Sequence, residues 1–358
     1  MHFLTTLFVV LTVFSSVAAK ADSVTEVLSE TGWVCPPCPH VDSLFQNTTH
    51  KEDGQCEICG MALVENPKGK MLNEIVIHDG SGNFVVEGSN SASHRPVVVF
   101  YYKPANLQHN SQILLVLPGA GRNAWDYRDS WIKAAEEHNV LILALHYAES
   151  FYPRFWNYNL GRMIDNVTIN QQKTAIAEFT FTAAKDEWIY RDFDRIFSRV
   201  RSHMGLSTQT YDLFGHSAGG QILHRLALFH RSNNANRILA SNSGWYTATD
   251  FQAEFPYGLK ASGLSVAELA SAFQQKLILF IGELDNENET RGHLVRNPDL
   301  DKQGTHRLAR AQYFYDTAKQ HAKTAELDFK WQLQLIPGVG HDYKRMSQAA
   351  ADYLYQSQ

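Results

Sequence analysis

A serine between glycines carries the strongest chemical signal in this chain of 358 residues. It lies in Gly215-His-Ser-Ala-Gly-Gly, after an apolar run that ends at Phe214 and before a helical pattern that begins near Gln221. In a strand–turn–helix context, G-x-S-x-G is typical of a nucleophile elbow, because glycines permit the tight turn that exposes the serine. The N-terminus of the following helix would favour developing negative charge. We predict that Ser217 is a nucleophile, with an ordinary turn serine as the alternative.

A serine hydroxyl needs a base, and the base needs an acid that orients it. The chain order in hydrolases with this elbow is serine, acid, histidine. His341 ends the segment Pro337-Gly-Val-Gly-His, and Asp285 follows the apolar run over 276–281. We predict that His341 accepts the proton of Ser217 and that Asp285 holds the imidazole of His341. Three other acids are rivals of Asp285: Glu283, Glu287 and Asp299.

Acyl transfer also needs an oxyanion hole with two backbone N–H donors. Ala218, directly after the nucleophile, is predicted to supply one donor. The second is expected from the loop Pro118-Gly-Ala-Gly-Arg, which follows the apolar run over 112–117. Ala120 is the preferred donor in this loop, and Gly121 is the alternative.

An aromatic cluster, Phe151-Tyr-Pro-Arg-Phe-Trp-Asn-Tyr, follows the apolar run that ends at Leu145. Open α/β sheets bind ligands beyond the carboxyl ends of their strands. Trp156, Tyr158 and Trp245 are therefore predicted to contact the substrate. The alternative is that the cluster only packs a loop against the protein.

All four cysteines lie in two C-x2-C pairs separated by seventeen residues. This spacing fits a four-thiolate zinc site. The predicted ligands are Cys35, Cys38, Cys56 and Cys59. Two disulfides are the alternative for an exported protein. Because all four cysteines lie within residues 30–67, we predict a small separate module there. For the same reason, disulfides cannot form the framework of the remaining chain.

The elements that must position these residues follow from the periodicity of apolar residues. Strands are expected at 74–78, 83–87, 96–102, 112–117, 140–145, 209–214, 237–240, 276–281 and 330–336. Helices are expected at 125–138, 188–203 and 221–230, and an irregular segment at 149–185. The first two strands are predicted to form a hairpin around Asp79-Gly-Ser-Gly. Strands separated by helices predict an α/β fold over 72–358, with a mostly parallel sheet covered on both faces.

Composition and the N-terminus bound the remaining possibilities. A hydrophobic share of 44% and a charged share of 19% are typical of a protein with a large core and exclude a disordered chain. The net charge of -5 argues against nucleic-acid binding. Residues 1–19 are apolar and end in Val-Ala-Ala, which predicts a signal peptide and a secreted or periplasmic protein without a transmembrane span after cleavage. An uncleaved membrane anchor is the alternative.

Two family resemblances rest on these motifs. The elbow, the Pro-Gly loop, Asp285 and the Gly-Val-Gly-His ending resemble the α/β-hydrolase superfamily over 72–358. Within it they look most like secreted polyhydroxybutyrate-depolymerase and feruloyl-esterase-type esterases. This resemblance implies hydrolysis of a small-molecule or polymeric ester through an acyl-enzyme, without a cofactor for catalysis.

Residues 33–65 resemble the heavy-metal-binding domain of bacterial metal-efflux proteins, through Cys35-Pro-Pro-Cys-Pro and Gln55-Cys-Glu-Ile-Cys-Gly-Met-Ala-Leu. Cys38 stands where those domains usually have His, and Glu57 where they usually have Pro. The resemblance implies a bound metal, and the thiolate-rich set favours zinc or Cu(I).

These observations predict an exported serine hydrolase of carboxylic esters with an N-terminal metal-binding module. A serine peptidase or amidase is one alternative, because the same triad serves both reactions. A metal-binding protein with a non-catalytic hydrolase scaffold is another. The sequence contains no H-E-x-x-H, P-loop or dinucleotide-binding glycine motif, which argues against metalloproteases, nucleotide hydrolases and NAD enzymes.

Overall fold

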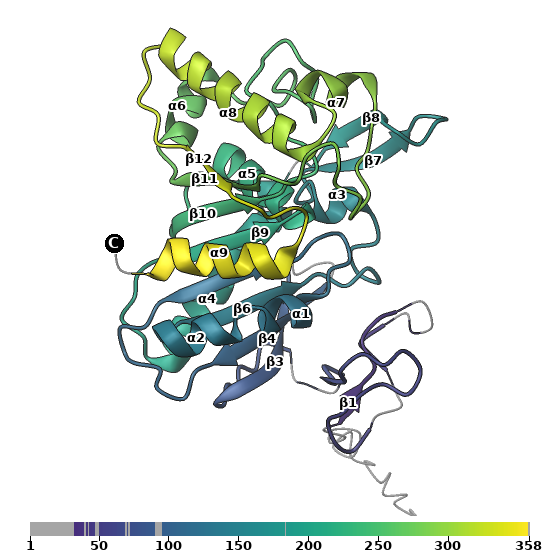
Figure 1. Cartoon of the computed structure of the whole chain (residues 1–358), viewed down its shortest axis with the longest axis vertical. Helices are drawn as coiled ribbons and strands as arrows, with labels where there is room; N and C mark the ends of the chain where they lie inside the picture. The colour runs from purple at the N-terminus through teal and green to yellow at the C-terminus, as the bar shows by residue number, and fades with distance from the viewer. Residues whose placement is uncertain are drawn as a thin grey trace, which may run out of the picture.

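An eight-stranded, mostly parallel sheet forms the centre of the computed structural model (Figure 1). The structure describes residues 32–38, 41, 43–46, 50–68, 70, 72–89, 95–182 and 184–356, so the predicted signal peptide lies outside the described residues. The strand order is β12-β11-β10-β9-β5-β6-β4-β3, and the pairs β3–β4 and β4–β6 are antiparallel. The strands are β3 (Gly80–Glu87), β4 (Pro96–Lys103), β5 (Ile113–Leu117), β6 (Leu141–His146), β9 (Tyr211–His216), β10 (Ala235–Ser241), β11 (Leu277–Gly282) and β12 (Gln332–Ile336).

Helices cover both faces of this sheet and bury one hydrophobic cluster on each. One face packs against α1 (Ala124–Asp129), α2 (Ile132–His138) and α9 (Tyr343–Tyr355). The other packs against α4 (Tyr190–Met204), α5 (Ala218–Phe229), α6 (Val266–Phe273) and α8 (Arg307–Thr324). Side chains in β5 alternate between the two clusters. Leu114 and Val116 belong to the first cluster, and the residues at 113, 115 and 117 belong to the second. Burial on both faces explains why this strand is apolar throughout.

The predicted hairpin at residues 74–87 is wrong. Residues 74–78 form no strand, and Gly80, Ser81 and Gly82 of the expected turn are the first residues of β3, which pairs with β4 instead. Gly82 lies against the ring of Tyr101, where a Cβ would come within 2.3 Å of the hydroxyl oxygen. This glycine therefore allows close contact within a strand rather than a turn between two strands.

The predicted helix over 125–138 consists of two helices, α1 and α2. The Ser130 hydroxyl donates to the carbonyl of Tyr127 at 2.7 Å and so competes with the helical bonding there. The other predicted helices and the strands from 83–87 onward are confirmed, with ends shifted by at most three residues.

The segment at 149–185 is more regular than predicted. It contains α3 (Phe155–Tyr158), a hairpin of β7 (Ile164–Ile169) and β8 (Ile176–Phe181), and a 3₁₀ helix at Lys185–Glu187. From Ala177 to Phe181, β8 alternates apolar and polar residues, and its Phe181 packs against Phe255 with ring centroids 5.0 Å apart. Aromatic side chains on one face anchor the hairpin to the protein.

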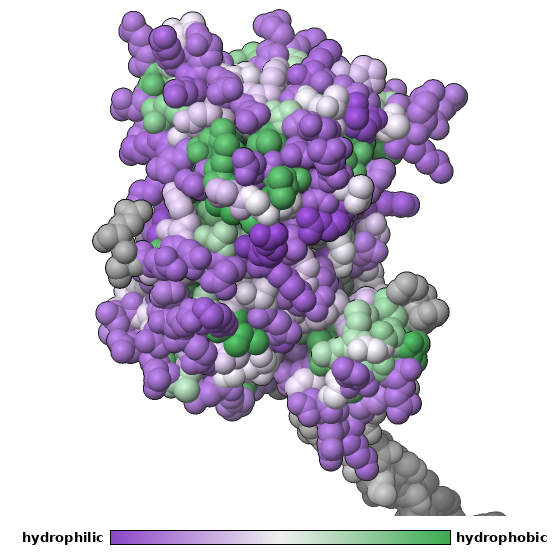
Figure 2. Space-filling view, viewed as in Figure 1, coloured by the Kyte–Doolittle hydropathy of each residue, from purple (hydrophilic) through white to green (hydrophobic). Residues whose placement is uncertain are grey.

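The described residues of the N-terminal module, within 32–68, contact the body at residues 72–356 (Figures 1 and 2). Its two short strands, β1 (Trp33–Val34) and β2 (Val64–Glu65), pair antiparallel. The side chain of Asn83 in β3 donates to the carbonyl of Glu65 at 2.8 Å. The ring of Phe45 meets Phe151 edge-on, with centroids 5.6 Å apart. The module thus contacts the body beside the aromatic segment. Among the described helices, none has the length and hydrophobicity that a bilayer span requires.

Candidate active site

Ser217 occupies a strained turn between β9 and α5. Its φ of 56° and ψ of -112° place a non-glycine residue in an unfavourable region of backbone space. The glycines around it are required, since a Cβ on Gly215 would lie 2.5 Å from the carbonyl oxygen of Gly219. A Cβ on Gly219 would lie 2.2 Å from the carbonyl oxygen of Leu117. The turn therefore has the predicted strand–turn–helix geometry of an elbow.

The structure brings Ser217, His341 and Asp285 together. His341 Nε2 lies 3.2 Å from Ser217 Oγ, and His341 Nδ1 lies 2.8 Å from Asp285 Oδ2. His341 precedes α9, and Asp285 follows β11 and is fully buried. With Nδ1–H donating to the carboxylate, Nε2 is free to accept the serine proton. This arrangement can perform nucleophilic acyl transfer.

The rival acids contact other groups. Glu283 accepts from the backbone N–H of Gly338, at 3.3 Å. Glu287 lies 3.5 Å from His306, and Asp299 pairs with Lys302 at 2.8 Å. None of the three has a described contact with His341.

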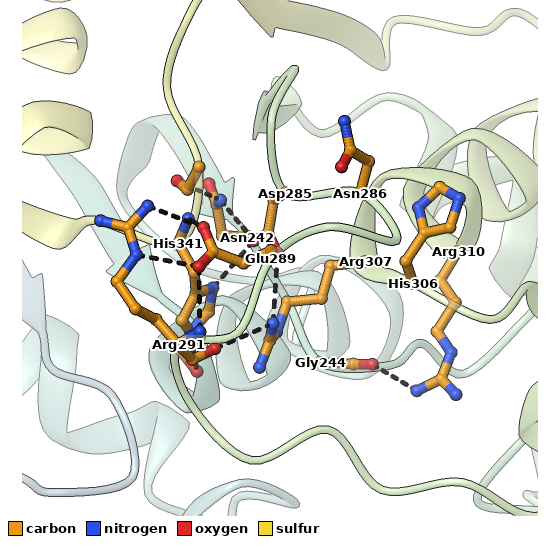
Figure 3. A network of polar contacts seen from close by, with 12 residues as sticks. Asn242, Gly244, Asp285, Asn286, Glu289, Arg291, His306, Arg307, Arg310 and His341 are labelled. Atoms are coloured by element: carbon orange, nitrogen blue, oxygen red, sulfur yellow. Dashed lines mark hydrogen bonds and ion pairs between the residues drawn. The ribbon is translucent and has the colours of Figure 1, made fainter.

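Two residues that the sequence analysis missed hold the carboxylate of Asp285 (Figure 3). Arg307 Nη1, at the start of α8, donates to Asp285 Oδ1 at 3.1 Å. Asn242 Nδ2, just after β10, donates to Asp285 Oδ2 at 2.6 Å. Both side chains are buried, so the charge of Asp285 is paired and hydrogen-bonded where water cannot solvate it. The sequence offers no periodic signal for either residue, because they lie on separate elements.

Glu289 holds the backbone next to the imidazole. It accepts a hydrogen bond from the N–H of His341 at 2.6 Å and pairs with Arg291 at 2.7 Å. The side-chain hydrogen bond from Arg291 is the main reason why the pKa of Glu289 falls to about 2. Glu289 thus stays ionised near neutral pH and fixes the start of the segment that carries His341.

His216 is a neutral neighbour of the imidazole. Its ring centroid lies 4.6 Å from that of His341, and its Nδ1 lies 3.0 Å from the hydroxyl of Tyr127. Burial, and to a smaller extent the charge of His341, hold the pKa of His216 well below its usual range. An uncharged His216 does not repel the imidazolium that His341 would become.

The two predicted oxyanion donors lie on the same cleft as Ser217. Ala120 and Ala218 both line it, and neither backbone N–H donates to an acceptor within the described residues. Free N–H groups are the normal state of a helix N-terminus such as Ala218. They are available for a negatively charged oxygen.

Tyr158 does not contact the cleft, so its predicted role in substrate binding is wrong. It is fully buried, and its hydroxyl donates to the carbonyl of Pro118 at 2.8 Å. It therefore holds the loop that carries Ala120. Beside it, the buried guanidinium of Arg122 donates to the carbonyls of Tyr147 and Tyr152, at 2.9 and 2.6 Å. Arg122, in the loop predicted to supply an oxyanion donor, thus holds the backbone of the aromatic segment in place.

The cleft around Ser217 has a volume of about 900 Å³, which suits a substrate larger than a short acyl group. Trp156 and Trp245 line it, as predicted for substrate contacts. The β7–β8 hairpin contributes one wall with residues 173–176, and α7 (Pro298–Gln303) contributes Leu300. The lining combines aromatic and apolar side chains with polar and charged ones such as Asn159, Gln221 and Arg291.

The four cysteines are not arranged as the predicted four-thiolate site. Cys35 and Cys56 form a disulfide, whereas Cys38 and Cys59 carry free thiols. A disulfide sulfur is not a thiolate ligand, so a site that uses all four cysteines does not fit this state. Within the described parts of the chain, no group of three or more His, Cys, Asp or Glu side chains is placed to hold a metal ion.

Two solved structures resemble the chain over most of its length. Poly(aspartic acid) hydrolase-1 from Sphingomonas sp. KT-1 is 32% identical, with a TM-score of 0.69, over 78% of this chain and 100% of that one. The poly(3-hydroxybutyrate) depolymerase LpqC from Bordetella parapertussis is 31% identical, with a TM-score of 0.69, over 78% of this chain and 91% of that one. No protein-family model matches the sequence, and no curated protein matches it closely enough to count as a relative.

Proposed function

Because the chain belongs to the α/β-hydrolase family that includes these two enzymes, we propose that it is an exported serine hydrolase of carboxylic esters. The contact of His341 with both Ser217 and Asp285 carries this proposal. The elbow geometry and the two free N–H donors support the same reaction class. Export rests on the composition of residues 1–19.

In the proposed reaction, Ser217 Oγ attacks the ester carbonyl while His341 Nε2 takes the hydroxyl proton. The N–H groups of Ala218 and Ala120 stabilise the resulting oxyanion. His341 then gives its proton to the alcohol oxygen as the ester bond breaks, which leaves an acyl group on Ser217. A water molecule, deprotonated by His341, attacks this acyl group. His341 then returns the proton to Ser217 Oγ as the bond between Oγ and the acyl carbon breaks, which releases the acid and restores the serine. Asp285, held by Arg307 and Asn242, stabilises the imidazolium at both steps.

A fluorophosphonate probe and a panel of 4-nitrophenyl esters test this proposal directly. We expect the wild type to be labelled and active, and Ser217→Ala to be unlabelled with kcat reduced about 10⁴- to 10⁶-fold. Ser243→Ala is the matched control, because Ser243 is also buried and follows the neighbouring strand β10. Equal labelling of the wild type and Ser217→Ala would rule the proposal out.

An amidase is the second candidate, since the relative from Sphingomonas is named for poly(aspartic acid), a polymer joined by amide bonds. The same set of residues can cleave an amide if His341 protonates the leaving nitrogen. Comparing kcat/KM for 4-nitrophenyl butyrate with that for butyryl-4-nitroanilide separates the two. A higher value for the anilide would make the protein an amidase.

For the module, we propose that zinc or Cu(I) binds when the Cys35–Cys56 disulfide is reduced, because the spacing of the pairs supports a four-thiolate set. The test is to reduce the full chain with a phosphine, count its thiols and measure bound zinc by mass spectrometry. One zinc ion per four thiols is the expected result. Four thiols without bound metal would contradict the proposal.

A further inference from the structure

The charges that line the cleft are all of one sign. Arg154, Lys173 and Arg291 line it, whereas no Asp or Glu does among the described lining residues. The chain as a whole has the opposite balance, with 37 acidic and 32 basic residues. Because the charged residues of the cleft are all cationic, the cleft attracts anions, although the net negative charge of the whole protein repels them.

Within the described part of the chain, two of these three cations have no acidic partner. Arg291 is neutralised by Glu289 and Asp342, at 2.7 and 3.2 Å. Arg154 and Lys173 are exposed and make no ion pair within the described residues. The charges of Arg154 and Lys173 are therefore available to a bound molecule, whereas the charge of Arg291 is balanced by its two carboxylate partners.

Both available cations stand on backbone that is held in place. The N–H of Arg154 donates to Asn157 Oδ1 at 3.0 Å, at the start of α3. Lys173 lies in the β7–β8 turn with a φ of 57°, and its N–H donates to the carbonyl of Asn170 at 2.9 Å. Asn297 ties the same turn to the loop before α7 through the carbonyl of Thr174, at 2.8 Å. The two segments thus present their cations to one cleft from fixed positions.

We propose that Arg154 and Lys173 form an anion subsite, so that the preferred substrate carries a carboxylate in addition to its scissile bond. This inference rests on the proposed function, because it assigns a substrate class to the Ser217 cleft. Guanidinium and ammonium groups both pair well with carboxylates, and Arg154 can do so in a bidentate manner. The apolar lining by Trp156 and Trp245 would then contact the part of the substrate between its two ends.

Two esters of equal chain length provide the test: 4-nitrophenyl hemisuccinate, which is anionic, and 4-nitrophenyl butyrate, which is neutral. We expect Arg154→Gln/Lys173→Gln to lose about tenfold in kcat/KM for the anionic ester, since one exposed ion pair contributes up to about fivefold. The neutral ester should change less than about twofold. Lys133→Gln on α2 is the matched control, because Lys133 is exposed outside the cleft and pairs with Glu137.

Charge reversal and salt sharpen this test. Lys173→Glu should favour the neutral ester more than Lys173→Gln does. In the wild type, the preference for the anionic ester should shrink at about 1 M salt, where charges are screened beyond ~3 Å. Equal effects of the double variant on both esters would overturn the subsite, and so would no effect on either. If the wild type cleaves neither ester and takes up no probe, the proposed function fails instead, and the subsite fails with it.

Discussion

The body and the N-terminal module differ in what holds their reactive side chains. In the body, His341 contacts Asp285, and the buried carboxylate of Asp285 receives further hydrogen bonds from Arg307 and Asn242. Among the described residues of the module, Cys35, Cys56 and Leu63 form a separate buried cluster. Cys35 and Cys56 are thus part of the core of the module, whereas Ser217, His341 and Asp285 are not members of the hydrophobic clusters of the body.

This difference predicts how each region responds to the loss of one contact. A change at the triad should impair a reaction without unfolding the body, unless it leaves a buried charge unpaired. A change at the cysteines should loosen the module and leave the body folded.

Loss of Arg307 should produce the largest effect on stability. Arg307→Leu removes the cation that pairs with the buried carboxylate of Asp285, and breaking a buried ion pair costs about 3–5 kcal/mol. We expect a large fall in the free energy of unfolding, together with a lower kcat. Denaturant unfolding and ester kinetics measure both.

Arg296→Leu is the matched control, since Arg296 pairs with Asp301 at an exposed position. It should cost less than about 1 kcal/mol. If the two variants lose equal stability, then the Asp285–Arg307 pair contributes no more than a surface ion pair.

The disulfide comes next, and its effect should be confined to the module. Cys35→Ser/Cys56→Ser opens a loop with a sequence separation of 21, which costs about 3 kcal/mol in chain entropy. We expect faster hydrogen exchange and proteolysis within residues 32–68, with kcat unchanged within about twofold. Cys38→Ser/Cys59→Ser is the control and should leave exchange unchanged. Equal effects of the two double variants would indicate that all four thiols act together, as in a metal site.

The three residues that meet at the site were predictable from the sequence, but the residues that hold them in place were not, and the reason is geometric. Ser217, Asp285 and His341 lie at strand ends in a fixed chain order, so motif and periodicity suffice to find them. Arg307 and Glu289 reach the site from a helix and a loop whose direction the sequence does not encode locally. Tyr158 was misassigned because an aromatic run has the same composition whether its rings face a cleft or a core.

The cysteine pairing could not be predicted for a different reason. A C-x2-C spacing is compatible with both metal and disulfides, and the choice depends on redox conditions as well as sequence. The prediction of a hairpin at 74–87 was wrong because Gly82 was interpreted as a turn residue. In the structure, this glycine leaves room for the ring of Tyr101.

Low pH should lower the free energy of unfolding of the body, because it protonates Glu289. Its pKa is about 2 in the folded protein and 4.5 when unperturbed, so its contribution is complete above about pH 5 and is lost as pH falls toward 2. Because Arg291, the partner of Glu289, is exposed, solvent screening limits the contribution of the pair to the free energy of unfolding to about 1 kcal/mol. We expect Glu289→Gln to lower Tm at pH 7 but to match the wild type near pH 2. A constant difference in Tm across this range would show that the effect is not due to ionisation.

The smallest effect tests whether the module influences the cleft at all. Phe45 of the module packs edge-on against Phe151, and the backbone that follows Phe151 leads to Arg154 and Trp156 in the cleft wall. An edge-to-face pair contributes about 0.5–1.5 kcal/mol. Phe45→Ala should therefore raise KM about two- to tenfold for the preferred ester without changing kcat, because the triad does not touch this segment.

Phe45→Tyr should restore the wild-type KM, since the ring is retained. Ile58→Ala is the control within the module, as Ile58 is 62% exposed. If Phe45→Ala leaves KM unchanged while the disulfide variant raises it, the two regions communicate through another contact. If neither variant changes KM, the module and the cleft are independent, and the difference between the two regions extends to function.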